Sequence, residues 1–296
     1  MLRGTKTISK VLNRAGFSPY WTLRGTPATL KKLTIVMYHS VHPMPAPHSV
    51  SPEAFLRHIT FIKENYALCA LGEIERFLLD ENDQERKVVI TFDDAYTNFI
   101  ESAFPILKRL NVPCTMFVPT GYIGGSNEWD ATYSAAPLRR VMGADQLRDL
   151  AKEGLVEFGS HTVDHVRLGS LPRKEMERQV VESKRRLEDV LGRSVVSFSY
   201  PYGQLGDYSV ATTEILAAAR YDRAVISRWS TLNSYRERMT LRRICFEEED
   251  EDRDLRAKIE GENDWFAAKE RVGNAFRTLS HVTRRLAKSR PEAPAQ

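Results

Sequence analysis

The stretch KVVITFDDAYTNF, Lys87 to Phe99, decides the fold. Its first six residues are mainly apolar and β-branched, which predicts a strand buried in a sheet. The strand runs directly into two neighbouring carboxylates, Asp93 and Asp94. Two like charges at the end of a buried strand are costly unless something compensates them. We therefore expect a positively charged group, such as a cation, at this point of the fold.

Strands and helices alternate on both sides of this stretch. Further strands are expected in LTIVMYHSV, ALCAL, PCTMFV, VEFGSHT, SVVSFSY, RAVISR and ERMTLRRICF. Helices are expected between them, one beginning after Ser51 in SPEAF and others ending near Gly154 and Gly192. About seven β-α repeats predict a parallel sheet with crossover helices. Over this length the repetition favours a closed or nearly closed barrel. His58 lies within a helical pattern and is expected at the surface.

Composition and charge narrow the class of protein. The chain has 296 residues with a net charge of +4, which is too small to indicate a nucleic-acid partner. The three cysteines form no C-x-x-C pair, which is typical of buried thiols in a reducing compartment. No signal-peptide core and no long apolar run is seen, so we expect a cytoplasmic protein without a transmembrane segment. The oligomeric state stays open.

Three regions are expected along the chain. Residues 1–30 are basic and weakly helical, and we expect them to form an N-terminal appendage. Residues 31–269 contain the repeated strands and helices of the barrel. Residues 270–296 form a basic tail that is expected to be partly disordered.

The polar candidates gather at the carboxyl ends of predicted strands. His39 follows the first strand, Asp93 and Asp94 follow VVITF, His161 follows VEFGS, and Tyr202 follows VVSFSYP. Active sites of parallel barrels lie at this end. Four strand ends on one face therefore predict one site.

The sequence GSHTVDH indicates a metal site. His161 and His165 are four residues apart, so both imidazoles can lie on one face of a helical turn. A carboxylate would complete a set of two histidines and one acid with a position open for catalysis. The alternatives are solvated histidines and an aspartate that only caps a helix. The combination favours a divalent metal, most often Zn²⁺ for these ligands, with one aspartate binding it and the other accepting a proton from the attacking water.

TFDDAY, SHTVDH and SYPYG, in that order, resemble the first three motifs of polysaccharide deacetylases, carbohydrate esterase family 4 with the NodB homology domain. The resemblance covers roughly Leu33 to Gly261. It implies a distorted, TIM-like (β/α)7 barrel and metal-dependent removal of acetyl groups from N-acetylated sugars. It also implies that Asp93 is the general base. The implied metal ligands are Asp94, His161 and His165. The backbone N–H of Tyr202 would donate to the oxyanion, with Pro201 fixing the approach.

The sequence departs from this family pattern in three places. Ala95 stands where the family has Gly, and a left-handed backbone there would cost Ala about 1 kcal/mol. Ser199 stands where an Arg normally orients the base. The late Leu-x-His motif that supplies a general acid has no match. Tyr38-His39 resembles the subgroup of poly-N-acetylglucosamine deacetylases with an N-terminal Tyr-His strand, so His39 is the expected acid; its alternative is a histidine bonded to backbone.

Two further residues are candidates for binding substrate. Trp129 and Asp130, in GGSNEWD, could stack on a sugar and bond to it, or could simply anchor the loop. No G-x-S-x-G motif occurs, which argues against a serine esterase. We predict a metal-dependent hydrolase that removes N-acetyl groups from N-acetylglucosamine-type poly- or oligosaccharides or lipid-linked sugars. The alternatives are an inactive carbohydrate-binding barrel and a deacylase of another amide.

Overall fold

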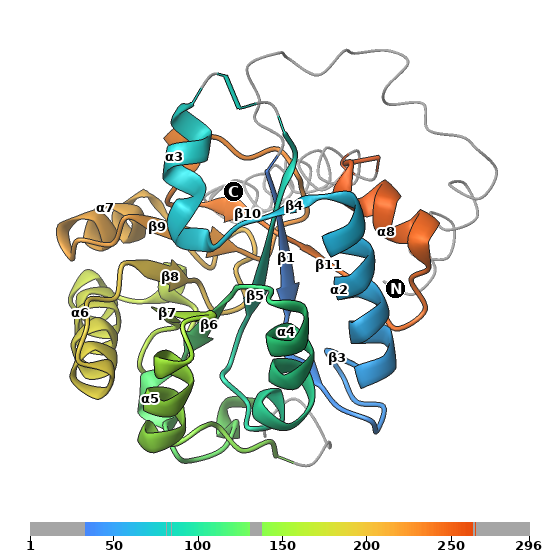
Figure 1. Ribbon diagram of the computed structural model, residues 1–296. Helices are drawn as coiled ribbons and strands as arrows, with labels where there is room; N and C mark the ends of the chain where they lie inside the picture. The colour runs from blue at the N-terminus through green and yellow to red at the C-terminus, as the bar shows by residue number, and fades with distance from the viewer. Residues whose placement is uncertain (1–32, 81, 84, 131–137, 263, 265–296) are drawn as a thin grey trace, which may run out of the picture.

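The computed structural model describes residues 33–80, 82–83, 85–130, 138–262 and 264 (Figure 1). The expected appendage at residues 1–30 and the expected tail at residues 270–296 lie outside this part of the chain. The described residues confirm the predicted fold class. Parallel strands form a nearly closed barrel, and helices lie around it (Figure 1).

The barrel is one sheet with a continuous order of parallel strands. From one end to the other the order is β10, β9, β8, β7, β6, β5, β1 and β11. Their bounds are β1 Leu33–Tyr38, β5 Lys87–Phe92, β6 Cys114–Val118, β7 Val156–Ser160, β8 Ser197–Ser199, β9 Arg223–Ile226, β10 Leu241–Arg242 and β11 Ile244–Cys245. The buried, β-branched sequences of β1 and β5 pair along their whole length, from Leu33 against Lys87 to Tyr38 against Phe92.

The two ends of this order are joined by one residue. β10 pairs with β9, β11 pairs with β1, and only Arg243 separates β10 from β11 in the chain. Residues 241–245 therefore take one strand position of the barrel, a stave, which pairs with β9 on one side and with β1 on the other. Counted in this way, the barrel has seven staves, as the expected (β/α)7 architecture requires.

Three short strands complete the sheets. The predicted strand in ALCAL shrinks to β4, Ala67–Leu68, which pairs with the first two residues of β5. The last two residues of β5 pair with β6 on that edge instead. β2, Ser40–Val41, and β3, Ser49–Val50, form a separate ladder beyond the end of β1.

Helices cover the outside of the barrel (Figure 1). Their bounds are α2 Pro52–Asn65, α3 Ile74–Leu79, α4 Phe104–Leu110, α5 Ala144–Lys152, α6 Arg173–Leu191, α7 Val210–Ala218 and α8 Asp252–Ile259. α2 begins where expected, because the Ser51 hydroxyl accepts a hydrogen bond from the Ala54 N–H and Pro52 needs no partner in the first turn. α6 ends at Gly192, which adopts a φ of 67°. None of the helices in the described ranges is long and apolar enough to span a bilayer.

The helical segment between β5 and β6 is divided in two. A π-helical turn spans Phe99–Ala103, and the regular helix α4 begins at Phe104. Pro105 in the first turn of α4 lacks an N–H and cannot continue a regular ladder from the preceding turn, so the change of pitch falls there.

The expectation that His58 lies at the surface was wrong. Its side chain is on the buried face of α2, and its Nδ1 lies 3.2 Å from the Tyr38 hydroxyl. Burial lowers the pKa of His58 to about 3, so the ring is neutral at physiological pH. The partner of this ring is Tyr38, the last residue of β1, and a helical pattern alone does not reveal such a contact.

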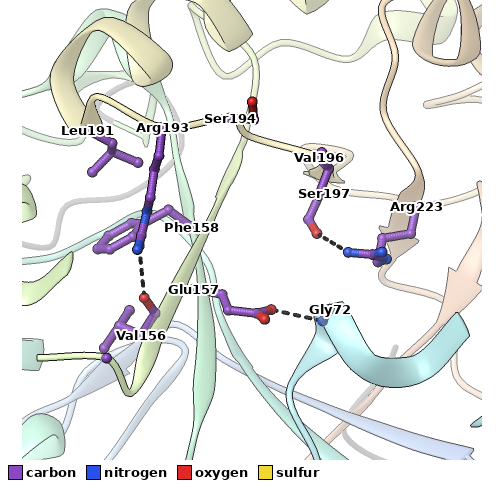
Figure 2. Close-up of a pocket in the computed structure, with 11 residues that line it drawn as sticks. Gly72, Val156, Glu157, Phe158, Leu191, Arg193, Ser194, Val196, Ser197 and Arg223 are labelled. Carbon is purple, nitrogen blue, oxygen red and sulfur yellow. Dashed lines mark hydrogen bonds between the residues drawn. The ribbon is translucent and has the colours of Figure 1, made fainter. Parts of the chain in front are cut away.

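The amino ends of the strands carry a separate cavity. It has a volume of 320 Å³ and is lined by residues that include Val156, Glu157, Ser197 and Arg223, at or near the starts of β7, β8 and β9 (Figure 2). Its polar groups bind one another: the Gly72 N–H donates to Glu157 at 2.9 Å. This cavity lies at the opposite end of these strands from the polar residues expected to form the site.

Candidate active site

Asp94, His161 and His165 come together at the carboxyl ends of β5 and β7. All three side chains are buried, and their potential ligand atoms lie within 4.8 Å of one another. The Asp94 Oδ1 atom is 3.3 Å from His165 Nε2 and 3.7 Å from His161 Nε2. The spacing of three donors around one point is compatible with a single divalent ion.

A hydrogen bond to the backbone fixes the orientation of the His161 ring. Its Nδ1 lies 2.7 Å from the Ser199 carbonyl oxygen at the end of β8, and a carbonyl can only accept, so Nδ1 carries the proton. The Nε2 lone pair then faces Asp94. Burial lowers the pKa of His161 to about 4, and the ring is neutral at pH 7. A neutral imidazole held by a hydrogen bond on its other nitrogen is a typical metal ligand.

Asp94 also fits a cation. Its Oδ1 is buried and has no hydrogen-bond partner among the described residues. Burial by itself raises the pKa of Asp94, but the contact with His165 and the nearby histidines outweigh this effect and hold the pKa well below its usual value. A buried, ionised oxygen without a hydrogen-bond donor is expensive unless a cation binds it.

The backbone of the site is strained. Among the described residues eight non-glycine positions have a positive φ, and five of them lie at or beside the site: Asp94, Ala95, Thr162, His165 and Tyr202. Such conformations cost of order 1 kcal/mol each and tend to gather at functional sites. Ala95 has a φ of 50°, so this position does adopt the conformation that would favour Gly.

Asp93 forms a buried ion pair with Arg243. The guanidinium reaches both carboxylate oxygens, with Nη1–Oδ1 at 2.8 Å and Nη2–Oδ2 at 2.7 Å. The side chains are 0% and 3% exposed. Burial by itself raises the pKa of Asp93, but Arg243 and then His161 outweigh it, so the carboxyl is ionised.

Arg243 is the functional residue that the sequence analysis missed. The family pattern places an Arg at position 199, where this chain has Ser. Ser199 now accepts a hydrogen bond from Arg243 Nη2 at 3.1 Å, and its hydroxyl lies 3.5 Å from Asp93. The small side chain leaves room for a guanidinium that arrives from another stave. The available signal was an arginine inside the strand-forming sequence TLRRICF, at a position that points into the barrel.

His39 lies on the same face, at the end of β1. Its ring centroid is 5.3 Å from that of His48, in the loop before β3. Both histidines line a cavity of 470 Å³ that also borders Phe246 and the carboxylates of residues 247–249. His39 therefore opens onto a space that a ligand can enter.

Aromatic rings surround His165. Trp129 stacks on it with ring centroids 4.5 Å apart and an interplanar angle of 28°, and Tyr202 meets it edge-on at 5.1 Å. Asp130 accepts a hydrogen bond from the Asn127 side chain at 3.0 Å. Pro201 is buried and immediately precedes Tyr202. The structure thus brings Trp129 and Tyr202 to the predicted metal site, while the roles of these residues toward a sugar remain predictions.

Comparisons with known proteins relate this chain to polysaccharide deacetylases. Residues 80–224 match the family model described as polysaccharide deacetylase. A poly-beta-1,6-N-acetyl-D-glucosamine N-deacetylase of Staphylococcus aureus (strain MRSA252) is 29% identical over 169 residues, which is 54% of this chain and 56% of the relative. YxkH of Bacillus subtilis (strain 168) is 26% identical over 185 residues, 62% of this chain and 61% of the relative. This chain therefore spans roughly three-fifths of the length of these curated relatives.

Solved structures share the fold. The deacetylase PplD of Streptococcus pyogenes, in complex with acetate, superposes with a TM-score of 0.64 at 25% identity, over 77% of this chain and 97% of that one. IcaB from Ammonifex degensii superposes with a TM-score of 0.67 at 22% identity, again over 77% of this chain and 97% of the other.

Proposed function

We propose that this chain, which carries a polysaccharide deacetylase domain, is a metal-dependent hydrolase that removes N-acetyl groups from N-acetylglucosamine-type saccharides. The observation that carries the proposal is the buried set Asp94, His161 and His165 beside the buried pair Asp93–Arg243. A binding module would need neither a buried carboxylate between two histidines nor a second ionised aspartate next to it. Zn²⁺ is the metal that this ligand set most often holds.

Each step of the proposed reaction is assigned to residues of this chain. Asp94, His161 and His165 would hold the ion, which when bound would act as a Lewis acid toward the acetyl carbonyl and a water molecule. Asp93, kept ionised by Arg243, would accept the proton of the attacking water. The backbone N–H of Tyr202 would donate to the oxyanion, and loss of one such donor typically costs about 3 kcal/mol. His39 would give a proton to the nitrogen as the C–N bond breaks, releasing acetate and an amine.

The substrate class is supported by the surroundings of the site. Trp129 exposes part of its ring beside His165, where a sugar can stack. The cavity of 470 Å³ beside His39 gives a saccharide room to extend away from the reacting acetyl group. The Staphylococcus aureus relatives are named for poly-β-1,6-N-acetyl-D-glucosamine, which makes this polymer the first substrate to test.

Acetate release from acetylated oligosaccharides tests the proposal. The purified chain should release acetate from oligomers of N-acetylglucosamine after Zn²⁺ is added back to chelated protein. His161→Ala should lose both the metal, measured by elemental analysis, and the activity. His58→Gln is the control, because this histidine is buried against Tyr38 and Phe246 and does not belong to the metal-ligand set, so the variant should keep the metal. Binding of oligosaccharide without acetate release would instead support a carbohydrate-binding barrel, and release from other amides alone would point to a different acyl carrier.

A further inference from the structure

We infer that Arg167 and Asp207 are positioning residues that clamp the turn carrying Tyr202 onto the turn carrying the metal ligands. The inference rests on the proposed function, because it concerns the residue expected to stabilise the oxyanion. Neither residue belongs to the motifs TFDDAY, SHTVDH and SYPYG. Their contacts with those motifs come from the structure alone.

Arg167 connects the two turns directly. It follows the ligand His165 by two residues, and its guanidinium carbon lies 3.8 Å from the centre of the Tyr202 ring. Tyr202 also meets the ring of His165, with the ring centroids 5.1 Å apart and an interplanar angle of 63°. The Tyr202 ring thus contacts both a metal ligand and a cation from the same turn.

Asp207 anchors the other end of the clamp. Its buried carboxylate receives Arg167 Nη1 at 2.6 Å and the Gln204 N–H at 2.8 Å. Its carbonyl oxygen accepts from the Gly169 N–H at 2.9 Å. The two backbones are so close that a Cβ on Gly169 would lie 2.1 Å from the Gly206 carbonyl oxygen. The turns are therefore joined through side-chain and backbone contacts together.

The turn needs such support because its conformation is unfavourable. Tyr202 has a φ of 62° and Gly203 a φ of 57°, so two successive residues are left-handed. A tyrosine relaxes readily from this region unless surrounding contacts hold it there. An oxyanion donor acts only when its N–H already points to the place where charge develops. The clamp would keep the Tyr202 N–H in that direction before substrate arrives.

This role differs from that of an ordinary surface ion pair. The Arg167 side chain is 51% exposed, and that of Asp207 is 6% exposed. Water still reaches the guanidinium, so the pair should contribute less to the free energy of unfolding than a fully buried pair does. Removing Arg167 should therefore act mainly on the turn at residues 201–207. Arg185, which pairs with Asp189 at 2.8 Å on α6, provides a control for the loss of an exposed arginine, with side chains 65% and 63% exposed.

The experiment compares Arg167→Met, Arg167→Lys and Arg185→Met in the full chain with Zn²⁺ bound. For Arg167→Met we expect kcat to fall roughly two- to fivefold, the size of an exposed cation–π contact, with unchanged KM and metal content. An activated acetyl ester should show the same fall, because its hydrolysis also passes through an oxyanion. Amide hydrogens in residues 201–207 should exchange faster. Arg167→Lys should recover part of both effects, and Arg185→Met should match the unmodified protein.

Two results would overturn the clamp. Exchange in residues 201–207 that is equal in Arg167→Met and Arg185→Met would show that the turn holds its shape alone. A fall in kcat accompanied by lost metal would mean that Arg167 supports His165 instead of Tyr202. If the unmodified protein releases no acetate, the proposed function fails, and the exchange measurement still decides whether the clamp exists.

Discussion

Replacing Arg243 by Met should destabilise the protein by about 3–5 kcal/mol at pH 7, because it leaves one member of a buried ion pair without its partner. The magnitude follows from the geometry. Two charge-assisted hydrogen bonds of 2.8 and 2.7 Å join Arg243 to Asp93, and the side chains are 0% and 3% exposed. Water cannot screen this pair, so the small values typical of surface pairs do not apply.

The penalty should depend on pH with a definite sign. In the unmodified protein Arg243 and His161 overcome the effect of burial and keep the pKa of Asp93 below 3.8. Without the guanidinium, burial dominates and the pKa of Asp93 rises above its unfolded value. The folded variant then takes up a proton more readily than the unfolded chain. The destabilisation should therefore be full at neutral pH and shrink as the pH falls through the raised pKa.

Urea unfolding of metal-free protein measures this effect. Arg243→Met, Asp93→Asn and the double variant form a cycle that isolates the interaction of the two residues. We expect the double variant to be more stable than Arg243→Met at pH 7, because it no longer buries an unpaired carboxylate. A loss below about 1 kcal/mol, or one that is the same with Asp93 and with Asn, would refute the reasoning.

Three further predictions concern single side chains. Asp93→Asn should lower turnover about 100-fold while elemental analysis still finds the metal; unchanged acetate release would reduce Asp93 to a structural partner of Arg243. His39→Ala should slow amide hydrolysis but spare an activated acetyl ester, whose leaving group needs no proton, whereas equal damage to both would assign His39 to substrate binding. Burial lowers the folded pKa of His58 from 6.5 to about 3, so the unfolded chain binds this proton more readily and stability should be lost as the pH falls between these values. His58→Gln should flatten that part of the pH dependence in urea unfolding, and an unaltered slope would contradict it.

The sequence predicted the elements whose signals are local. Strand β5 was expected at its observed bounds, because its apolar residues end abruptly at two carboxylates. The grouping of Asp94 with His161 and His165 was also expected, since the carboxyl ends of parallel strands share one face. The helix after Ser51 was marked by its capping residue.

The parts that could not be predicted depend on contacts between distant residues. Arg243 lies 150 positions from Asp93, and the family pattern directed attention to position 199 instead. His58 follows a helical pattern that does not tell which face meets a tyrosine hydroxyl. The contact of Arg167 with Tyr202 joins two loops whose approach is set by the spacing of β7 and β8. In each case the two partners are separated along the chain, and only the folded structure shows that they are neighbours.

The position of Arg243 has a consequence for the order of folding. It is the residue between β10 and β11, in the stave that joins β9 to β1, and it is also the cation that Asp93 requires. During synthesis this stave emerges after all the others. We expect any chain that ends before residue 241 to leave the barrel open and Asp93 without its cation. Closure of the barrel and pairing of the proposed base Asp93 with its cation would then be completed in a single event, so a truncated chain should be both less stable and inactive.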